Sequence, residues 1–475
     1  MKSMLILATA LFLLSGYSSS VLAAPAKPNV IVVLIDDMGW SDLSCYGGAT
    51  PTPAIDRMAK EGIRFTHFYA NAPICSPSRT ALLTGQYPQR WRITSFLENR
   101  QANAARGMAQ WLDPKAPTLA RGLKTAGYAT GHFGKWHMGG QRDVGDAPLI
   151  EEYGFDQSLT NFEGLGPRVL PLLNSYDGSP PKKYDLGSAK LARGAIRWED
   201  RSVITSSYVK EALAFVDQSQ TAGKPFFLNL WPDDVHSPFF PPKSPKEESG
   251  GGKRARYHAV IEAMDRQLAV LFDRIRDDAK LRGNTLILIT SDNGPEPGAG
   301  SATPLRGHKG LLYEGGVREP LIVWGPGFIA DGKSGTTNSK SALSSIDLNR
   351  SLYSITGTEL PPGVTLDGED FSETLVGKAE RQREAPIFWR RPPDRPGTPE
   401  EANPDLAARD GNWKCYVNYD GGKAQLYDLG TDESEAHDVA ARHPDVVQRL
   451  SKAMLDWNSK LPPDAGDPAF KPAAK

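Results

Sequence analysis

The amino-acid sequence predicts an α/β fold: a central, mostly parallel sheet flanked by helices, followed by a smaller C-terminal α+β unit with an antiparallel sheet. Two observations predict it. Apolar, β-branched runs alternate with helical patterns over most of the chain, and from residue 376 onward short strand patterns joined by Asp/Gly turns replace them. Because 475 residues exceed the usual size of one domain, we expect two units, at 24–375 and 376–475.

Four apolar runs are predicted to form strands of the central sheet. Their nearly continuous hydrophobicity is typical of strands buried on both faces, as in a parallel sheet covered by helices. The runs are 29–35, 225–231, 284–291 and 320–324. By contrast, 139–196 is rich in Gly, Pro and polar residues without clear periodicity, so we expect long loops over a functional face there.

Helix start signals and periodicity predict three helices in the larger unit. A Thr-Pro pair opens the first, at 52–60, and Thr118 caps the second, at 118–127. The third, at 255–278, has long amphipathic periodicity. In the C-terminal unit we expect strands at 386–390, 413–419 and 424–429, followed by a helix at 444–460.

The charge balance and the cysteine count exclude two classes of protein. The 55 Lys and Arg residues against 56 Asp and Glu residues give a net charge of −1, which lacks the broad positive surface of a nucleic-acid or anionic-membrane binder. Three cysteines, Cys45, Cys75 and Cys415, are too few for a disulfide framework in a chain of this length. At least one of them is unpaired, and the sequence leaves open whether Cys45 and Cys415 pair.

The N-terminus has the three-part layout of a secretory signal peptide. Lys2 precedes an apolar run at 4–14, and a Ser-rich segment leads to a small-residue ending at 21–24. No later apolar run is long enough to span a bilayer. We therefore expect a signal peptide at 1–23 and a periplasmic or secreted protein that does not associate with a membrane after cleavage.

Two acidic pairs follow predicted strands and suggest a metal site. Asp36 and Asp37 come directly after the first strand, and Asp292 and Asn293 follow another. One such pair alone is as well explained by a turn or a helix cap. Two pairs at the carboxyl ends of strands, where open α/β sheets bind ligands, can converge on one cation. Their ligands are all oxygens, which favours Ca²⁺ or Mg²⁺ over Zn²⁺.

The segment from Cys75 to Gly85 carries the most specific motif. Taken alone, Cys75 could be a buried structural thiol, or a nucleophile with a histidine partner as in a cysteine protease. However, C-x-P-S-R followed by A-x-L-T-G resembles the maturation signature of the type I, formylglycine-dependent sulfatases of the alkaline-phosphatase-like superfamily. The resemblance implies that a formylglycine-generating maturation enzyme oxidises Cys75 to an aldehyde. In that family, the hydrated aldehyde attacks the sulfur atom with one hydroxyl, and the other hydroxyl later expels sulfate by re-forming the aldehyde.

Further segments match this family in order along the chain, although each would be a weak signal alone. They are 127–130, 134–139, 236–238, 292–294, 307–310, 313–320, 324–327 and, in the C-terminal unit, 425–429. The resemblance implies an alkaline-phosphatase-like fold and a single Ca²⁺. Its implied ligands are Asp36, Asp37, Asp292, Asn293 and the formylglycine formed from Cys75.

The resemblance also implies the roles of the remaining site residues. Arg79 would orient the hydrated formylglycine, and Lys135 and Lys309 would hold sulfate oxygens. His137 would remove a proton during sulfate release, and His236 would protonate the leaving oxygen or hold the bridging oxygen. These cations stand where S–O cleavage develops negative charge.

The predicted function is a sulfuric ester hydrolase that releases inorganic sulfate from a sulfate monoester, with a sulfated small molecule or saccharide as substrate. The alternatives are an arylsulfatase-like enzyme, a phosphonate or phosphate monoester hydrolase of the same fold, and a non-catalytic carbohydrate-binding relative. Two-zinc phosphatases resemble this strand end but have Asp-His where this chain has Asp292 and Asn293, and an amide is a poor zinc ligand.

Several other side chains near the motifs are candidate substrate contacts. His308 replaces the small residue often found at that position, and it is either a substrate contact or a solvated histidine. Five aromatic residues could stack on a sugar ring or belong to the core: Trp91, Trp136, Trp231, Phe239 and Phe240.

Overall fold

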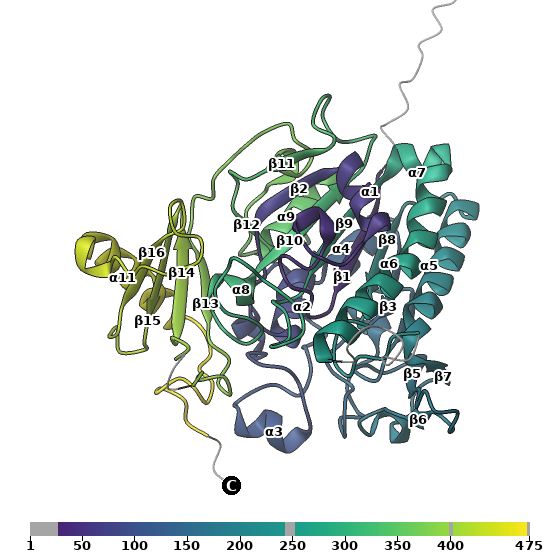
Figure 1. Ribbon diagram of the computed structural model, residues 1–475, viewed down its shortest axis with the longest axis horizontal. Helices are drawn as coiled ribbons and strands as arrows, with labels where there is room; N and C mark the ends of the chain where they lie inside the picture. Colours follow the sequence, from purple (N-terminus) through teal and green to yellow (C-terminus); the bar gives the residue numbers. More distant parts are fainter. Residues whose placement is uncertain (1–26, 243–251, 399–401, 473–475) are drawn as a thin grey trace, which may run out of the picture.

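The structure is a computed structural model that describes residues 27–242, 252–398 and 402–472 (Figure 1). A large sheet covered by helices and a smaller sheet beside it make up the molecule. The expected signal peptide at 1–23 lies outside the described residues. Among the helices that the structure describes, none has the length and apolarity needed to cross a bilayer.

Twelve strands of the described part of the chain form the large sheet. Its central path runs β11 (Thr336–Asn338), β2 (Ile63–Tyr69), β10 (Arg318–Trp324), β9 (Thr285–Ser291), β1 (Asn29–Ile35), β8 (Phe226–Trp231), β3 (Ala129–Gly134), β4 (Gln157–Thr160), β5 (Arg168–Leu173) and β6 (Lys182–Lys183). Beside this path, β12 (Leu343–Ser344) pairs with β2, and β7 (Ile196–Asp200) pairs with β5.

The four predicted strands correspond to β1, β8, β9 and β10, with boundaries that agree within two residues. Strand β1 is parallel to both β8 and β9. Strand β10 is antiparallel to its two neighbours, β9 and β2. The sheet is therefore mixed but mostly parallel. A buried apolar run does not reveal its direction, because strands of either direction are equally apolar when helices cover both faces.

Helices cover both faces of this sheet, and alternate residues of β1 point into two separate cores. Ile31, Val33 and Ile35 pack in the core under α1 (Pro53–Glu61), α5 (Ile204–Thr221) and α6 (Lys253–Asp277). Val30, Val32 and Leu34 pack in the core under α2 (Cys75–Thr84), α4 (Leu119–Thr125) and α9 (Ser345–Ile355). This alternation is the period of two that a strand buried on both faces requires.

The predicted helices at 52–60, 118–127 and 255–278 are α1, α4 and α6. Pro53 begins α1, and the Thr118 side chain accepts a hydrogen bond from the Arg121 N–H at the start of α4. Four further short helices are α3 (Arg100–Ala105), α7 (Ala279–Asn284), α8 (Glu314–Val317) and α10 (Ser372–Leu375).

The expectation of long loops at 139–196 is wrong in part. Strands β4, β5 and β6 lie within this range, and β7 begins at its end, so the segment extends the large sheet. These strands are short, and Pro167 and Pro171 interrupt their pattern. A period of two cannot emerge over so few residues. The segment still carries loops to the site, as described below.

The C-terminal unit is a four-stranded antiparallel sheet with one helix on its outer face (Figure 1). Leu450 and Met454 of the helix pack against Leu406, Cys415 and Leu426 of the sheet. The prediction missed one strand because its sequence, LAARD, is rich in Ala and charged residues. In chain order the elements are β13 (Ile387–Arg390), β14 (Leu406–Asp410), β15 (Trp413–Val417), β16 (Gln425–Asp428) and α11 (Pro444–Asn458).

The inner face of the smaller sheet packs on the larger unit around a buried ion pair. Lys414 of β15 lies 2.8 Å from Glu314 of α8, and both side chains are fully buried. The Tyr69 hydroxyl of β2 donates to the other oxygen of Glu314 at 2.6 Å. The pair therefore joins the two sheets in a place where water cannot replace either partner.

Removing one partner of this pair is expected to destabilise the protein strongly. Lys414→Met removes the nearer of the two cations that face the buried Glu314 carboxylate and leaves only Arg318, 3.6 Å away; loss of a partner from a buried pair typically costs up to about 3–5 kcal/mol. Lys452→Met is the control, because Lys452 is exposed and its pair with Asp456 is of the surface type, worth at most about 1 kcal/mol. Thermal and urea unfolding of both variants measure the difference. Equal losses would contradict the structural importance of the buried pair.

Candidate active site

The acidic pairs meet because β1 and β9 are parallel neighbours in register, with Ile35 opposite Ser291. Asp36 and Asp37 therefore leave the sheet at the same edge as Asp292 and Asn293, and all four are buried. Asp37 has a left-handed backbone, with φ of 58°, and its N–H donates to Asp292 Oδ1 at 3.1 Å. This turn folds the chain back immediately after the strand and directs both carboxylates into the site.

The oxygens at this edge fit a cation. One ligand atom each from Asp36, Cys75 and Asp292 lie within 4.8 Å of one another. Asn293 donates from Nδ2 to Asp37 Oδ1 at 2.8 Å, which leaves its Oδ1 buried and without a hydrogen bond from the described residues. A buried amide oxygen without a donor is costly unless a cation or water fills the space beside it. The ligand set contains carboxylate and amide oxygens, which suit a hard divalent ion.

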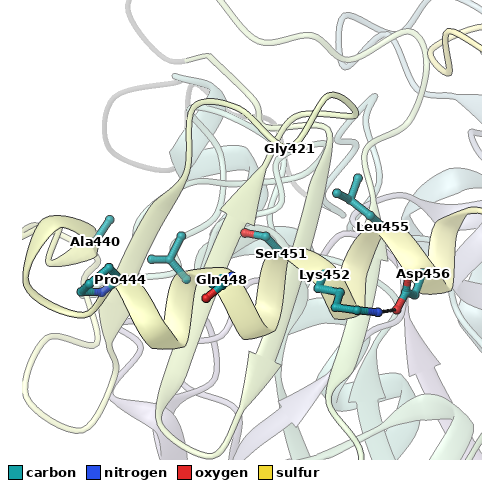
Figure 2. Close-up of a pocket in the computed structure, with 9 residues that line it drawn as sticks. Gly421, Ala440, Pro444, Gln448, Ser451, Lys452, Leu455 and Asp456 are labelled. Atoms are coloured by element: carbon teal, nitrogen blue, oxygen red, sulfur yellow. Dashed lines mark hydrogen bonds and ion pairs between the residues drawn. The ribbon is translucent and has the colours of Figure 1, made fainter.

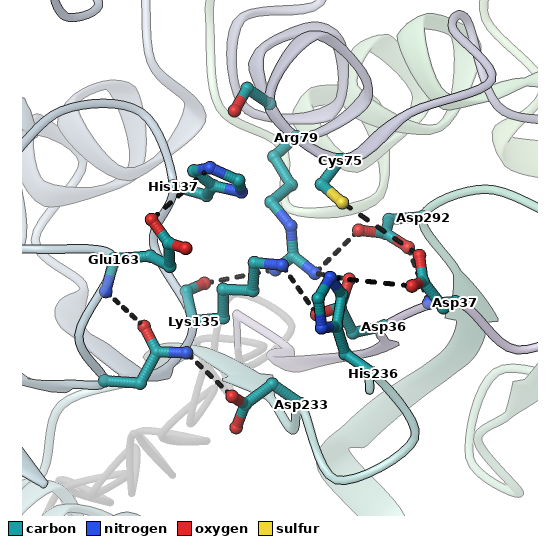
Figure 3. Close-up of polar contacts among 12 residues, drawn as sticks. Asp36, Asp37, Cys75, Arg79, Lys135, His137, Glu163, Asp233, His236 and Asp292 are labelled. Carbon is teal, nitrogen blue, oxygen red and sulfur yellow. Dashed lines mark hydrogen bonds and ion pairs between the residues drawn. The ribbon is translucent and has the colours of Figure 1, made fainter. Parts of the chain in front are cut away.

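Cys75 is the first residue of α2 and is buried at the same place. Its Sγ atom lies 4.0 Å from Asp37 Oδ1 (Figure 3). Burial raises the pKa of the thiol to about 12. The unmodified thiol is therefore protonated at neutral pH and is a poor nucleophile, which argues against the cysteine-protease alternative.

Three cations surround the carboxylates. Arg79, one turn further along α2, places Nη2 2.7 Å from Asp292 Oδ2 and 3.0 Å from Asp36 Oδ1 (Figure 3). Lys135, directly after β3, lies 2.7 Å from Asp36 Oδ2. On the other side, Lys309 lies 2.5 Å from Asp37 Oδ2.

These charges shift the acidity of the carboxylates in opposite directions. Burial alone would raise the pKa of Asp36, but Lys135 and Arg79 hold it well below its usual range. Burial raises the pKa of Asp292 to about 7, and the pull of Arg79 is offset by Asp36 and Asp37. Three cations thus face up to three carboxylate charges, and the cluster itself has little excess positive charge for an anionic ligand. A divalent cation would supply that excess.

Two histidines complete the site from opposite sides (Figure 3). His137, after β3, lies with Nε2 2.9 Å from the Leu97 carbonyl and 3.4 Å from Glu163 Oε2. His236, after β8, places Nε2 3.7 Å from Asp37 Oδ2. Burial lowers the pKa of both rings, and Lys135 contributes to each; His236 also faces Lys309, and its pKa falls to about 4. Both rings are therefore neutral at pH 7 without substrate.

A cavity of about 440 Å³ opens over these groups. Cys75, His137, His236 and Lys309 lie in its wall, and the space is large enough for a sugar ring beside a sulfate group. Side chains that the sequence did not single out form most of the remaining wall. They include Phe96, Arg142, Phe162, Glu163, Tyr184, Leu186 and Arg395.

Comparisons with known proteins decide the family. A family model described as Sulfatase matches residues 28–358. The chain belongs to the sulfatase family. It is 34% identical to N-acetylgalactosamine-6-sulfatase of Sus scrofa over 395 residues, which cover 80% of this chain and 72% of that protein. It is 31% identical to human arylsulfatase A over 487 residues, which cover 91% and 88% of the two chains.

A solved structure, that of Ps i-CgsB in complex with k-i-k-neocarrahexaose, has the same fold. It superposes with a TM-score of 0.74 at 24% identity and covers 93% of this chain and 94% of that one. The sulfatase is thus a sulfuric ester hydrolase of the alkaline-phosphatase-like superfamily, and both predictions are confirmed. Sulfatases generally need a formylglycine and a metal, and the cluster of Asp36, Cys75 and Asp292 is a possible metal site.

Several side chains of the sulfatase that the sequence suggested as substrate contacts lie elsewhere. His308 is not part of the cavity wall, and its Nδ1 lies 2.9 Å from the carbonyl of the next residue. Of the five aromatic candidates, Trp136, Trp231 and Phe239 belong to the two cores, and Trp91 and Phe240 do not line the cavity either. Proximity to a motif along the chain does not predict which side chains line the cavity, because neighbouring residues of a strand or turn point in different directions.

The aromatic wall of the cavity comes instead from Phe96, Phe162 and Tyr184, which lie in irregular segments. Glu163 and Arg142 come from the range 139–196, and Arg395 comes from the C-terminal unit. Isolated charged residues in loops carry no sequence signal that separates them from solvated ones. All three cysteines are free thiols, so Cys45 and Cys415 do not pair.

A second hollow, of about 500 Å³, lies along α11 in the C-terminal unit (Figure 2). Val447, Ser451 and Leu455 of the helix line it, together with Gly421. It contains none of the predicted site residues, and no cluster of nucleophilic or metal-binding groups lies in its wall. The cavity lined by Cys75, His137, His236 and Lys309 is therefore the candidate active site.

Proposed function

We propose that this sulfatase hydrolyses a sulfate monoester of a saccharide, with a formylglycine formed from Cys75 as nucleophile and one Ca²⁺ in the site. The observation that carries the proposal is the position of Cys75. It begins α2 within reach of the oxygen cluster and below a cavity with room for a sugar. Two comparisons support a saccharide: the porcine relative is named for a sulfated amino sugar, and the fold neighbour Ps i-CgsB was solved with an oligosaccharide.

Asp36, Asp37, Asp292 and Asn293 are the protein ligands proposed for Ca²⁺. Their oxygens meet at one sheet edge, and the free Oδ1 of Asn293 would face the ion. When bound, Ca²⁺ supplies the positive charge that an incoming sulfate anion needs beside three carboxylates. An all-oxygen set with an amide is unsuitable for the two zinc ions of phosphomonoesterases, and this favours the sulfatase over that alternative.

Lys135 and Lys309 are proposed to bind the sulfate oxygens. Each lysine lies on one side of the carboxylates, and Lys309 also lines the cavity. Each ammonium group would turn from its carboxylate partner to a sulfate oxygen, with the carboxylates serving as ligands of the bound Ca²⁺. Arg79 is fully buried and holds Asp36 and Asp292, so it orients the nucleophile from below rather than contacting the leaving group.

The two histidines are proposed to move protons on opposite sides of the sulfate. When hydrated, formylglycine supplies a hydroxyl nucleophile and a second hydroxyl whose proton must be removed for sulfate to leave. His137 would accept that proton at Nδ1, because its Nε2 is directed at the Leu97 carbonyl. His236 would donate from Nε2 to the leaving oxygen. The negative charge of a bound sulfate ester would offset the positive charges of Lys135 and Lys309, which help burial to lower the pKa of His236. We therefore expect the pKa of His236 to rise when substrate binds.

We further propose that the protein is exported and matured before it can act. The N-terminal signal peptide at 1–23 would direct it to the periplasm or the exterior. A formylglycine-generating enzyme would act as a maturation partner on Cys75. We also propose a division into a catalytic unit at 24–375 and a C-terminal unit at 376–475; the first strand of the second sheet, β13, begins 11 residues after the proposed boundary and supports it.

The first test is the chemical state of residue 75 in active protein. Trypsin releases a peptide that ends at Arg79, and its mass distinguishes an aldehyde from a thiol. We expect the aldehyde in preparations that release sulfate from defined sulfated saccharides. An active preparation in which residue 75 is entirely cysteine would refute the mechanism. Activity on phosphonate or phosphate monoesters alone would instead support the alternative hydrolase.

The second test is the metal. Asp292→Ala is expected to weaken Ca²⁺ binding by at least about 100-fold, since even the loss of a residue behind the ligands costs up to that much. Asp42→Asn is the matched control, because Asp42 is a buried carboxylate bonded to Gly39, Ser301 and Tyr257 and not to the ion. Calorimetric titration with Ca²⁺ and elemental analysis measure both. Two tightly bound zinc ions would contradict the proposal.

A further inference from the structure

The two histidines of the site are joined by a buried chain of hydrogen bonds, whose other residues are not among the ligands proposed for the metal or the sulfate. It begins at His137, whose backbone is left-handed with φ of 54°. The His137 N–H donates to the Glu163 carbonyl at 2.8 Å, and the ring faces the carboxylate of the same residue. A left-handed backbone at a non-glycine residue persists only where neighbouring groups hold it in place.

The Leu97 carbonyl, with the Glu163 carboxylate beside it, defines which nitrogen of His137 carries the proton. Nε2 faces two acceptors, the Leu97 carbonyl at 2.9 Å and Glu163 Oε2 at 3.4 Å, so the hydrogen resides on Nε2. Nδ1 is buried and has no hydrogen-bond partner among the described residues. The arrangement leaves Nδ1 with a free lone pair, as a base requires.

The chain continues from Glu163 through a single buried asparagine. The Glu163 N–H donates to Asn161 Oδ1 at 2.8 Å, and Asn161 Nδ2 donates to Asp233 Oδ2 at 2.8 Å (Figure 3). Asn161 and Asp233 are almost completely buried. Asn161 therefore accepts a hydrogen bond from Glu163 with its side-chain oxygen and donates one to Asp233 with its side-chain nitrogen. Only a side-chain amide of this length can do both here.

Asp233 then connects to His236 through Arg201. Arg201 Nη1 lies 2.9 Å from Asp233 Oδ2, and its Nη2 donates to the carbonyls of Asp233 and, at 3.2 Å, His236. The His236 N–H donates to the Asp233 carbonyl at 3.1 Å. The turn that carries His236 is thus held at its N–H by the Asp233 backbone carbonyl and at its own carbonyl by Arg201, the partner of the Asp233 carboxylate.

We propose that Glu163, Asn161, Asp233 and Arg201 are positioning residues that hold His137 and His236 as one rigid unit across the cavity. The geometry assigns the link to Asn161, because it joins the loop after β4 to the loop after β8. The inference rests on the proposed function, which gives the two histidines their roles in proton transfer. It adds that their spacing is maintained independently of Cys75, the metal and the substrate.

The test uses histidine ring NMR signals of the full chain with Cys75→Ala, so it requires neither maturation nor turnover. The sequence has eight histidines, and His137→Gln and His236→Gln assign the two relevant signals. Asn161→Leu keeps the volume of the link and removes its hydrogen bonds. We expect the signals of both histidines to shift. Thr205→Val, which removes the buried bond from Thr205 to Asp234 next to the chain, is the control and should shift neither.

A second variant and a kinetic measurement test the same role of Asn161. Asn161→Ser remains polar but is too short to reach both partners, so it serves if Asn161→Leu fails to fold. In matured enzyme, either variant should lower kcat on a sugar sulfate by about 100-fold, the cost of misplacing a reacting group by about 1 Å, with KM changed less than about threefold. An unchanged His236 signal, or an equal shift in the control, overturns this inference. A matured wild-type enzyme that releases no sulfate overturns the proposed function instead.

Discussion

Replacing Cys75 with Ala is expected to abolish sulfate release, with a loss on the order of 10⁶-fold, as for removal of the nucleophile in other hydrolases. The fold should persist, because Ala keeps the helical start of α2 and the side chain that is lost is small. Cys415→Ala is the matched control: Cys415 is also fully buried, but it lies in the core of the C-terminal unit. Turnover of a sulfated saccharide and the melting temperature are measured for both variants.

The control separates chemistry from packing. Both variants delete one buried sulfur atom and should lower the melting temperature by similar amounts. If Cys75→Ala kept more than a trace of activity, Cys75 would not be the nucleophile. If Cys415→Ala lost activity to the same extent, the effect of both variants would be structural.

His236→Ala is expected to cost about 10²–10⁴-fold in kcat/KM on a sugar sulfate, the usual worth of general acid catalysis. On an activated aryl sulfate the loss should be much smaller. A sugar alkoxide is a strongly basic leaving group and needs a proton as the S–O bond breaks, whereas a nitrophenolate leaves without one. His308→Ala is the control, since His308 does not line the cavity, and it should change neither activity more than about twofold.

The ratio of the two losses decides the role of His236. A variant that is misfolded, or that lacks a contact shared by both substrates, loses both activities by similar factors. Equal losses would therefore assign His236 to binding or structure. The acid would then have to be another group in the wall of the cavity, and His137 is the remaining histidine there.

The sequence by itself determined the parts of this sulfatase that depend on local pattern. Strands β1, β8 and β9 are continuous apolar runs, and the helices α1 and α4 begin at recognisable caps, so their boundaries could be predicted within a few residues. The acidic pairs could be located because they follow strands directly, and parallel neighbours bring such ends together whatever the rest of the chain does. The maturation motif at Cys75 is equally local, since it is a run of adjacent residues.

Tertiary structure alone decided which further side chains reach the site. Asn161 and Asp233 join loops that are 72 residues apart in the chain, and Arg395 comes from the loop between β13 and β14 of the smaller sheet. Whether such residues touch depends on how the sheet twists and how loops pack, which no local pattern encodes. The same reason explains why β10 is antiparallel and why Trp136 and Trp231 belong to the core. Both depend on what lies beside the strand, and only the folded chain determines that.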